Sequence, residues 1–504
     1  MTQIAARVAA WPAWGQVAFA LIFGALGSFS HAPFSFGPAI LAPLVAGFVL
    51  LRGAGTLRAA LIRGWALGLG DFAFTLSWIT EPFQVDAATT GWMAPFALVL
   101  LALLLGSFWA AALTFARWAG GQAWALILAW SGAELLRAHV FTGFPWAAPP
   151  QALVDGLAGQ GLAWLGPHGM MLALVATAGV IVAAISTLLS AVAAVTAIAA
   201  IVIPVSPPNR TDTAYTIRRV QPNAPQHEKW DPERIPVFVN RQIGYTADGP
   251  VPDLVLWPET ALPYLAENAQ PAFDVIAQAA RGAPVVLGIQ RRGGSDYFNS
   301  LVMLDADGQV TQTYDKHHLV PFGEYMPAEW LFRRIESGGL AARAEGGYTG
   351  GPGPQLLDLG ALGRALPLIC YEVVFAHNVG GAPARPAFLM QLTNDAWFGS
   401  RSGPQQHLAQ ARMRAIEQGL PMVRAANTGI SAMIDPKGHI TASLPLNTAG
   451  YIDVVLPAPG KPTLYSQTGD TPWVLLVLAG LFWCVLRHAR ARRTDAIDEA
   501  QPDG

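Results

Sequence analysis

Long apolar segments recur along this 504-residue chain and restrict its fold more than any other feature. A helix needs roughly 20 mostly apolar residues to cross the hydrocarbon core of a bilayer. Candidate spans lie at residues 14–30, 36–51, 59–79, 92–116, 122–138, 166–186 and 189–205, and a last one begins at Thr471. Only 13% of the residues are charged, and a soluble chain of this size cannot bury all eight runs. The sequence therefore predicts an α-helical membrane bundle of about eight spans.

The arginines near the ends of these spans predict the orientation of the bundle. One set falls on the same side of successive spans: Arg7, Arg52, Arg58, Arg63, Arg117, Arg487, Arg490, Arg492 and Arg493. The opposite side carries Glu81, Asp86, Asp155 and a single arginine, Arg137. Cytoplasmic loops carry the excess of Lys and Arg in membrane proteins. We therefore expect both termini in the cytoplasm and the long polar segment before the last span outside it.

Residues 206–469 differ in composition from the rest of the chain, because they hold most of the charges, many prolines and several short β-rich runs. We expect strands near residues 214–220, 253–259, 284–290, 299–305, 366–372, 387–395, 431–436 and 451–457, and helices at 266–280 and 405–418. Strands and helices mixed on this scale predict an α/β domain with a largely buried sheet. The predicted organisation is a membrane domain at 1–205, an inserted domain at 206–469, a last helix at 470–493 and a tail at 494–504.

Composition also argues against several classes of partner. The formal net charge is -2 and the basic residues form no large block, so we expect no nucleic-acid partner. The two cysteines, Cys370 and Cys484, lie in segments of different character, so we expect no disulfide and a free thiol at Cys370. His317 and His318 are adjacent, but no spacing typical of a metal site, such as His-x-x-x-His or Cys-x-x-Cys, is present. We expect neither a metal nor a cofactor.

Two stretches of the inserted domain offer a base and a cation. In "LVLWPET" (254–260) a strand stops at Pro258 and leaves Glu259 at its end. Such a carboxylate is either a solvated strand end or, if enclosed by apolar groups, a general base. In "YDKHHLVPFGEYMP" (314–327), Lys316 and Glu324 lie in a loop dense in polar groups. Taken alone, Lys316 is equally consistent with a surface lysine.

A third stretch, "LICYEVVF" (368–375), places Cys370 among apolar, strand-forming residues. A lone cysteine in such a setting is more often a core residue than a nucleophile. A thiol becomes nucleophilic where a base or a cation favours its thiolate, and Glu259 and Lys316 supply one of each. The combination favours the nucleophile over the core residue.

The fourth stretch is "LTNDAWFG" (392–399) with the segment that follows it. Asn394 and Asp395 come where a strand gives way to a loop, which by itself indicates an ordinary turn. His407, Arg412 and Arg414 fall on the expected helix, where a solvated charged face is the simplest interpretation. The Gly-rich stretch at 337–353 suggests a further hypothesis, namely loops that gate a lipid entrance.

Together these motifs resemble the nitrilase superfamily, and more closely its bacterial inner-membrane branch, the apolipoprotein N-acyltransferase family. The matching segments are "QPNAPQHEKWDPE", "WPETALP", "KHHLVPFGEYMP", "CYE", "NDAWFG" and "ANTG", in the order expected of that family. The resemblance implies an α-β-β-α sandwich inserted before the last membrane helix, where residues 206–469 lie here. It also implies an inner-membrane location with the catalytic domain in the periplasm.

The resemblance assigns roles to individual residues. Glu259 matches the general base, Lys316 the cation that stabilises an oxyanion, and Cys370 the nucleophile. Glu324 matches an additional essential glutamate of the family, and Tyr371 and Glu372 match the two residues that follow its nucleophile in the "CYE" motif. Trp230, in "KWDPE", matches a tryptophan associated with lipid or substrate handling.

The implied reaction moves a fatty acyl chain from a phospholipid, through a thioester on Cys370, to the α-amino group of the diacylglyceryl-cysteine at the N-terminus of an apolipoprotein. The implied enzyme is a monomer without a cofactor. One alternative is a membrane-tethered amidase that hydrolyses a small amide with water. Another is a non-enzymatic scaffold or a transporter. Transporters usually carry ionisable groups inside their spans, and here such groups are few, chiefly Asp71 and Glu134.

Overall fold

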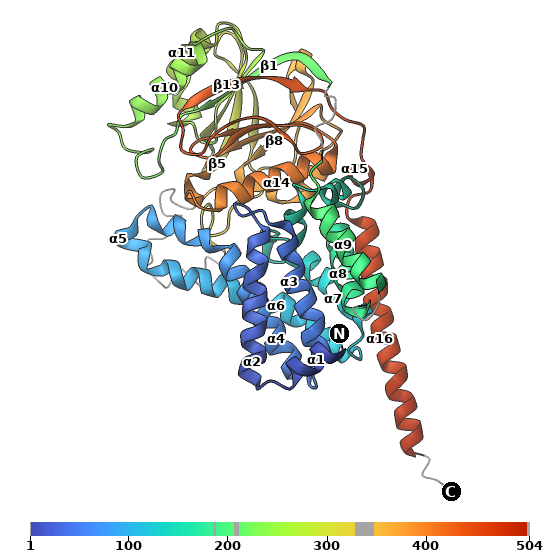
Figure 1. Ribbon diagram of the computed structural model, residues 1–504. Helices are drawn as coiled ribbons and strands as arrows, with labels where there is room; N and C mark the ends of the chain where they lie inside the picture. Colours follow the sequence, from blue (N-terminus) through green and yellow to red (C-terminus); the bar gives the residue numbers. More distant parts are fainter. Residues whose placement is uncertain (1, 185–187, 206–210, 328–346, 501–504) are drawn as a thin grey trace. The chain divides into compact units, whose positions relative to one another are not determined.

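The computed structural model describes residues 2–184, 188–205, 211–327 and 347–500. The chain forms two compact units, one of Met1–Ser206 with Thr463–Gly504 and one of Pro207–Pro462. Each unit is described by itself (Figure 1). The Gly-rich stretch at 337–353, to which the sequence hypothesis of gating loops refers, lies outside the described residues as far as residue 346.

The first unit consists of helices. The long ones are α2 (Ala13–Gly27), α3 (Leu41–Arg52), α4 (Leu57–Thr75), α6 (Ala94–Trp118), α7 (Ala123–Arg137), α8 (Leu162–Ala184), α9 (Leu188–Val202) and α16 (Thr471–Ala500), and the short ones are α1 (Thr2–Ala9), α5 (Ala87–Thr90) and α15 (Leu464–Thr468). Helix α4 packs against α2 and α6, and α7 packs against α6, α8 and α16. Small residues permit the close crossings, since a Cβ at Gly24 would lie 2.1 Å from the carbonyl oxygen of Leu67.

Each of the eight apolar runs contains a helix, but eight membrane crossings do not follow from the helix lengths. Among the described residues, the segments long and apolar enough to cross a membrane are Ala13–Ser30, Ala87–Trp118, Leu157–Ala183 and Thr471–Arg493. These are 4 candidate spans, and there are 5 if Leu57–Thr75 and Ser77–Gln84, two helices with a bend of 63° between them, count together as one span. Gly37–Arg52 and Ala191–Val202 are shorter apolar helices, and α7 has 15 residues. The structure thus supports a helical bundle with about four spans.

A few charged side chains are buried among these apolar helices. Arg137 and Glu134 form an ion pair at 2.5 Å, and the Trp109 indole N–H donates to Glu134 Oε1 at 2.8 Å. Arg137 also donates to the carbonyl oxygen of Trp146 at 2.8 Å. Arg137 is the last residue of α7, and Glu134, one turn earlier, and nearby carbonyls provide it with a buried site.

The second unit contains two β-sheets. The first has the order β13-β1-β2-β4-β5-β6, with β3 beside β4, and the second has the order β12-β11-β10-β9-β8-β7. The strands of the first sheet are β1 (Asp212–Gln221), β2 (Leu254–Leu256), β3 (Leu262–Leu265), β4 (Val285–Gly293), β5 (Asp296–Leu304), β6 (Val310–Asp315) and β13 (Gly450–Pro457). Those of the second are β7 (Leu357–Asp358), β8 (Arg364–Ile369), β9 (Phe388–Thr393), β10 (Met422–Ala426), β11 (Ser431–Ile434) and β12 (Ile440–Leu444).

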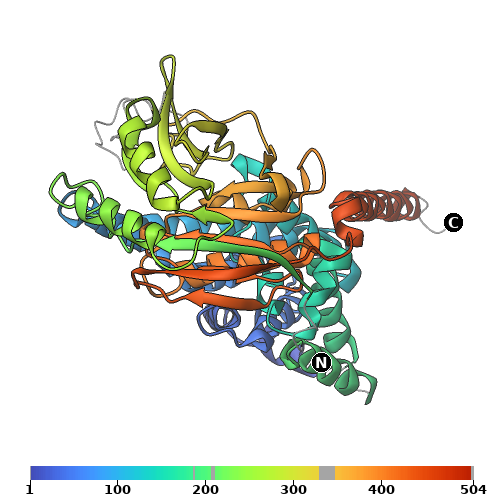
Figure 2. The same ribbon diagram turned by 90° about the horizontal axis from the view of Figure 1, so that it is seen from above.

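The strands that open and close this unit lie side by side. β1 pairs antiparallel with β13, with Ile217 opposite Val454, and the two ribbons run together in both views (Figures 1 and 2). β1 is also parallel to β2, which is parallel to β4. β8, β9 and β10 are parallel to one another at the centre of the second sheet.

Helices cover the outer face of each sheet. α10 (Ile235–Ala247) and α11 (Gln270–Ala280) pack against the first sheet, α14 (Gly403–Gln418) packs against the second, and β1 faces β10 between them (Figure 1). Central strands such as β9 are buried along their whole length, as expected for strands covered on both faces. The predicted α/β domain with α-β-β-α layering is therefore confirmed.

Candidate active site

The three residues proposed to act together each follow a strand. Glu259 follows β2, Lys316 follows β6, and Cys370 follows β8, so the two sheets bring them to one place. Lys316 Nζ lies 3.5 Å from Glu259 Oε1. The charges of Glu259 and Lys316 both reach the Cys370 thiol, since the first raises its pKa and the second lowers it. All three side chains are buried, with residue exposures of 6%, 1% and 4%.

Glu259 is surrounded by hydrogen-bond donors. The Asn299 side-chain amide donates to its Oε1 at 2.7 Å, and the backbone N–H of Asn394 donates to its Oε2 at 2.8 Å. The reading of Glu259 as a solvated strand end is wrong. A buried carboxylate with both oxygens hydrogen-bonded is held in one orientation, as a base must be.

Lys316 is shared by two carboxylates. Its ammonium donates to Glu324 Oε1 at 2.9 Å, and Asn299 Nδ2 donates to the same oxygen at 2.8 Å. Burial alone would lower the pKa of Lys316, but Glu324 and Glu259 outweigh it and raise the pKa above the ordinary value. Lys316 is therefore a permanently charged, buried cation, and the reading as a surface lysine is wrong.

Cys370 occupies a tight turn. It has φ 49°, in the left-handed region, where β8 passes into the 3₁₀ turn η10 (Cys370–Val374). Burial raises the pKa of the thiol well above its usual range, Glu259 adds to the rise, and Lys316 together with a hydrogen bond from Thr393 acts against it. The resting thiol is thus neutral, and a base must take its proton when the sulfur attacks.

Glu372 ties the Lys316 loop to the Cys370 turn. It is fully buried and accepts hydrogen bonds from the Tyr314 hydroxyl and the His317 backbone N–H, both at 2.8 Å, and from the Ile369 N–H at 2.7 Å. Burial acts to raise the pKa of Glu372, but the His317 side chain and the backbone N–H groups of Ile369 and His317 lower it overall. Its neighbour Tyr371 is also buried. In the described part of the chain, no group of three or more His, Cys, Asp or Glu could hold a metal ion.

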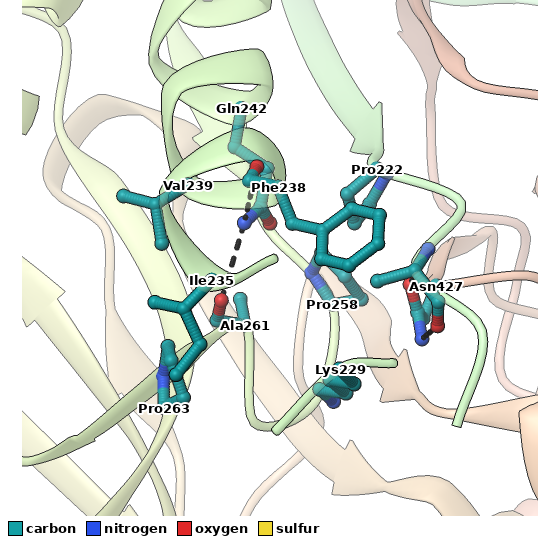
Figure 3. Close-up of a pocket in the computed structure, with 11 residues that line it drawn as sticks. Pro222, Lys229, Ile235, Phe238, Val239, Gln242, Pro258, Ala261, Pro263 and Asn427 are labelled. Carbon is teal, nitrogen blue, oxygen red and sulfur yellow. Dashed lines mark hydrogen bonds between the residues drawn. The ribbon is translucent and has the colours of Figure 1, made fainter. Parts of the chain in front are cut away.

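A second buried lysine, Lys229, lies beside the site and was not among the predicted site residues. Lys229 Nζ donates to the Glu259 carbonyl oxygen at 3.2 Å and to Thr260 Oγ1 at 2.6 Å, in a turn where Thr260 has φ 44°. It lines a pocket with Phe238 and Pro258 (Figure 3). Trp230 is partly buried, with its ring centre 5.8 Å from the Lys229 ammonium. One signal was available, since the chain has only four lysines, at positions 229, 316, 437 and 461.

Lys229 predicts a measurable pH dependence of stability. Burial lowers its pKa to about 8, against the charge of Glu259, which acts to raise it. Above this pH the unfolded chain, whose lysines titrate near 10.4, binds more protons than the folded one, so the unfolding free energy rises with pH until both forms are neutral. We expect wild type to gain up to about 3 kcal/mol relative to Lys229→Met between pH 8 and pH 10.4. Urea unfolding in detergent at several pH values measures this, with the exposed Lys437→Met as control.

If the Lys229→Met and wild-type profiles stay parallel over that range, Lys229 does not have the lowered pKa. The Lys437→Met control is expected to follow the wild-type profile throughout, because this side chain is exposed.

The stretch after β9 contributes to the site instead of forming an ordinary turn. Asn394 and Asp395 are 2% and 0% exposed, and Asn427 Nδ2 donates to Asn394 Oδ1 at 2.8 Å. The expected solvated face of α14 is also wrong for His407 and Arg414, which are 0% and 3% exposed. This face of the helix covers the second sheet, where buried polar groups provide partners. Arg412, which is partly exposed, donates to the Gly438 carbonyl oxygen at 2.7 Å.

Each of the two units matches a known protein family. The carbon-nitrogen hydrolase family model matches residues 236–459, and the apolipoprotein N-acyltransferase N-terminal domain model matches residues 23–180. The apolipoprotein N-acyltransferase of Rhodopseudomonas palustris is 36% identical over 95% of this chain and 96% of that protein. That of Caulobacter vibrioides is 38% identical over 92% and 93%. An amidase from Nesterenkonia sp. of known structure is 21% identical over 52% of this chain and 96% of its own, with a TM-score of 0.38.

The second unit is thus a carbon-nitrogen hydrolase domain, with the α/β fold of that class. The similarity to the N-acyltransferases extends over both units and nearly the full length of each relative. The chain belongs to the apolipoprotein N-acyltransferase family.

Proposed function

We propose that this protein completes the N-acylation of bacterial lipoproteins, moving an acyl chain from a phospholipid to the lipoprotein through a thioester on Cys370. Membership of the family over 95% of the chain supports lipoprotein N-acylation by a membrane enzyme. The observation that carries the chemistry is the buried contact of Glu259 with Lys316, whose charges both act on the Cys370 thiol.

In the first half-reaction, Glu259 takes the thiol proton while the Cys370 sulfur attacks the ester carbonyl of a phospholipid acyl chain. The carbonyl oxygen becomes negative, and the charged Lys316 ammonium stabilises it. The carbon–oxygen bond to the glycerol then breaks, and Glu259 returns its proton to the leaving oxygen. A lysophospholipid departs and an acyl thioester remains on Cys370.

In the second half-reaction, the neutral α-amine of the diacylglyceryl-cysteine attacks the thioester carbonyl. Glu259 accepts a proton from this amine, and Lys316 again stabilises the negative oxygen. The carbon–sulfur bond breaks, and the Cys370 thiolate recovers the proton from Glu259. The products are an amide on the lipoprotein and free enzyme.

Other residues support these steps in the proposal. Glu324 shares the Lys316 ammonium, and Glu372 anchors both the Lys316 loop and the turn next to Tyr371. Trp230, near the pocket beside Glu259, would contact lipid or acceptor. No metal or cofactor is needed, because the three side chains supply base, cation and nucleophile.

The proposal includes a membrane topology. Eight helices would cross the inner membrane, with residues 1–205 and 470–493 in the bilayer and both termini, including the tail 494–504, in the cytoplasm. The catalytic domain, 206–469, would lie in the periplasm, and the enzyme would act as a monomer. The arginine distribution supports this orientation. The amidase and scaffold alternatives are not favoured, since the relatives of both units are N-acyltransferases.

Intact mass spectrometry tests the proposed function. Purified full-length protein in detergent is incubated with a dipalmitoyl phospholipid, and the expected result is a palmitoyl adduct on Cys370 that hydroxylamine removes. Cys370→Ala is expected to carry no adduct, and addition of a diacylglyceryl-cysteine peptide is expected to discharge the wild-type adduct as an N-acyl peptide. A wild-type protein that gains no adduct, or whose adduct only hydrolyses in the presence of the peptide, would contradict the proposal.

A further inference from the structure

Two buried side chains lie next to the carbonyl oxygen of the proposed nucleophile, and one of them, Gln391, donates a hydrogen bond to it. Gln391 Nε2 donates to the Cys370 carbonyl oxygen at 3.2 Å, and His407 Nε2 lies 3.1 Å from the same oxygen. Gln391 comes from β9 and His407 from α14, and both are 0% exposed. The sequence motif around Asp395 and His407 therefore converges on the backbone of Cys370, a role that the two half-reactions above leave unused.

The orientation of the Gln391 amide is determined by its other partners. Arg424 Nη1 donates to Gln391 Oε1 at 2.5 Å, so the amide nitrogen faces the other way, toward Cys370. Arg424 Nη2 donates to Asp395 Oδ2 at 2.5 Å, and His407 Nδ1 lies 2.9 Å from Asp395 Oδ1. These four side chains, Gln391, Asp395, His407 and Arg424, are here called the carbonyl clamp.

The protonation states are consistent with one hydrogen-bond pattern. Arg424 and His407 lower the pKa of Asp395 to about 2 against its burial, so this carboxylate is ionised. Burial and Arg424 lower the pKa of His407, so the imidazole is neutral and carries one proton. With that proton on Nδ1 and donated to Asp395, Nε2 accepts from Gln391 Nε2, 3.2 Å away. The second hydrogen of the Gln391 amide then donates to the Cys370 carbonyl.

Cys370 needs such support because of its backbone. A non-glycine residue at φ 49° is strained and persists only where its surroundings impose the conformation. The peptide between Cys370 and Tyr371 is planar and trans, so fixing its carbonyl oxygen also fixes its N–H in the opposite direction. An N–H fixed in this way is preorganised to donate to a negative oxygen.

We infer that the carbonyl clamp is the positioning device of the nucleophile: Gln391 orients the Cys370–Tyr371 peptide so that its N–H acts with Lys316 on the oxyanion. Asp395, His407 and Arg424 hold the Gln391 amide in the orientation that does this. The inference rests on the proposed thioester chemistry and adds four residues to it. It predicts a defect in the attack on a carbonyl, and no defect in the ability of the thiol to ionise.

Gln391→Met tests this inference, since methionine has similar length but no donor. Two rates are measured on full-length protein in detergent: single-turnover acylation by a dipalmitoyl phospholipid, and alkylation of Cys370 by iodoacetamide, which forms no oxyanion. We expect acylation to slow by 10-fold or more, toward the 10²–10³-fold range for loss of an oxyanion donor, with the half-saturating phospholipid concentration unchanged. Alkylation is expected to stay within about threefold of wild type.

A matched control is Gln312→Met. Gln312 also donates to a backbone carbonyl, that of Asp358 at 2.6 Å, but on β6 and away from the site. It is expected to leave both rates unchanged. Arg424→Lys is a milder variant for the case that Gln391→Met does not fold, because a lysine cannot hold Gln391 and Asp395 together; it is expected to slow acylation more than alkylation.

Each outcome is decisive for one claim. Wild-type acylation rates in both clamp variants would overturn the inference, and so would equal losses of acylation and alkylation that follow a loss of folded protein. If wild type itself forms no thioester, the proposed function is wrong, and the role of the carbonyl clamp falls with it.

Discussion

Replacement of Glu259 by glutamine is expected to slow thioester formation by roughly 10²–10⁴-fold, the range that a general base supplies. Because burial raises the pKa of the Cys370 thiol, the resting enzyme holds no thiolate, and the proton must leave as the sulfur attacks. Glutamine preserves the size of the side chain and one acceptor oxygen but takes up no proton. Single-turnover acylation of the full-length protein by a phospholipid, followed by mass spectrometry, measures the effect.

The glutamine variant also requires a check on folding. Its amide nitrogen would face a donor, either the Asn299 amide or the Asn394 N–H, where Glu259 now accepts from both. An unsatisfied pair of donors costs about 1–3 kcal/mol, so urea unfolding is measured in parallel. Glu267→Gln, at an exposed carboxylate of the same unit, is expected to acylate at the wild-type rate. A folded Glu259→Gln enzyme that acylates within threefold of wild type would remove Glu259 from the mechanism.

Lys316→Met is expected to destabilise the fold more than the other substitutions, and it is also expected to slow the reaction. It leaves Glu259 and Glu324 buried without the cation that both contact, and breaking a buried ion pair costs about 3–5 kcal/mol. The rate of thioester formation is expected to fall by roughly 10²–10³-fold, because the substitution removes an oxyanion donor. The pKa of Lys316 is raised above the unfolded value of about 10.4, so its stabilising contribution is complete below that pH and is lost only as the pH rises through the folded value.

Urea unfolding at pH 7 therefore reports the whole loss for Lys316→Met. Lys437→Met, at an exposed lysine, is expected to unfold at the wild-type midpoint. An unchanged midpoint for Lys316→Met would show that the two carboxylates do not depend on the ammonium, and an intact thioester rate would exclude Lys316 as the oxyanion partner.

The fold was predictable from the sequence where apolar patterns are strong. The apolar strands β4, β8 and β9 and the boundary between helical and mixed composition were all expected. β10 was missed because Arg424 interrupts its apolar pattern, and the distant Asp395 and Gln391 make that arginine acceptable in the core. Eight spans were expected from run lengths alone, but α3 has 12 residues, since residues 37–40 form a separate 3₁₀ turn.

The candidate site was predictable only as a set of residue types in a given order. Chain order cannot show that Glu259 and Lys316 meet, because their contact depends on pairing between strands of the first sheet. Lys229 and His407 were missed or misread for a similar reason. Each is a polar residue in a stretch rich in polar residues, and it becomes buried only through tertiary contacts.

The antiparallel pairing of β1 with β13 has a consequence for how this protein is made. Asp212 lies opposite Pro457, so a strand near the start of the inserted domain has its edge covered only by one synthesised 245 residues later. Until then, β1 presents an open edge, which is a site for wrong pairing with other chains. The nascent domain therefore cannot complete its first sheet before nearly all of it has emerged, and truncation before residue 450 would leave an aggregation-prone chain anchored by its first helices.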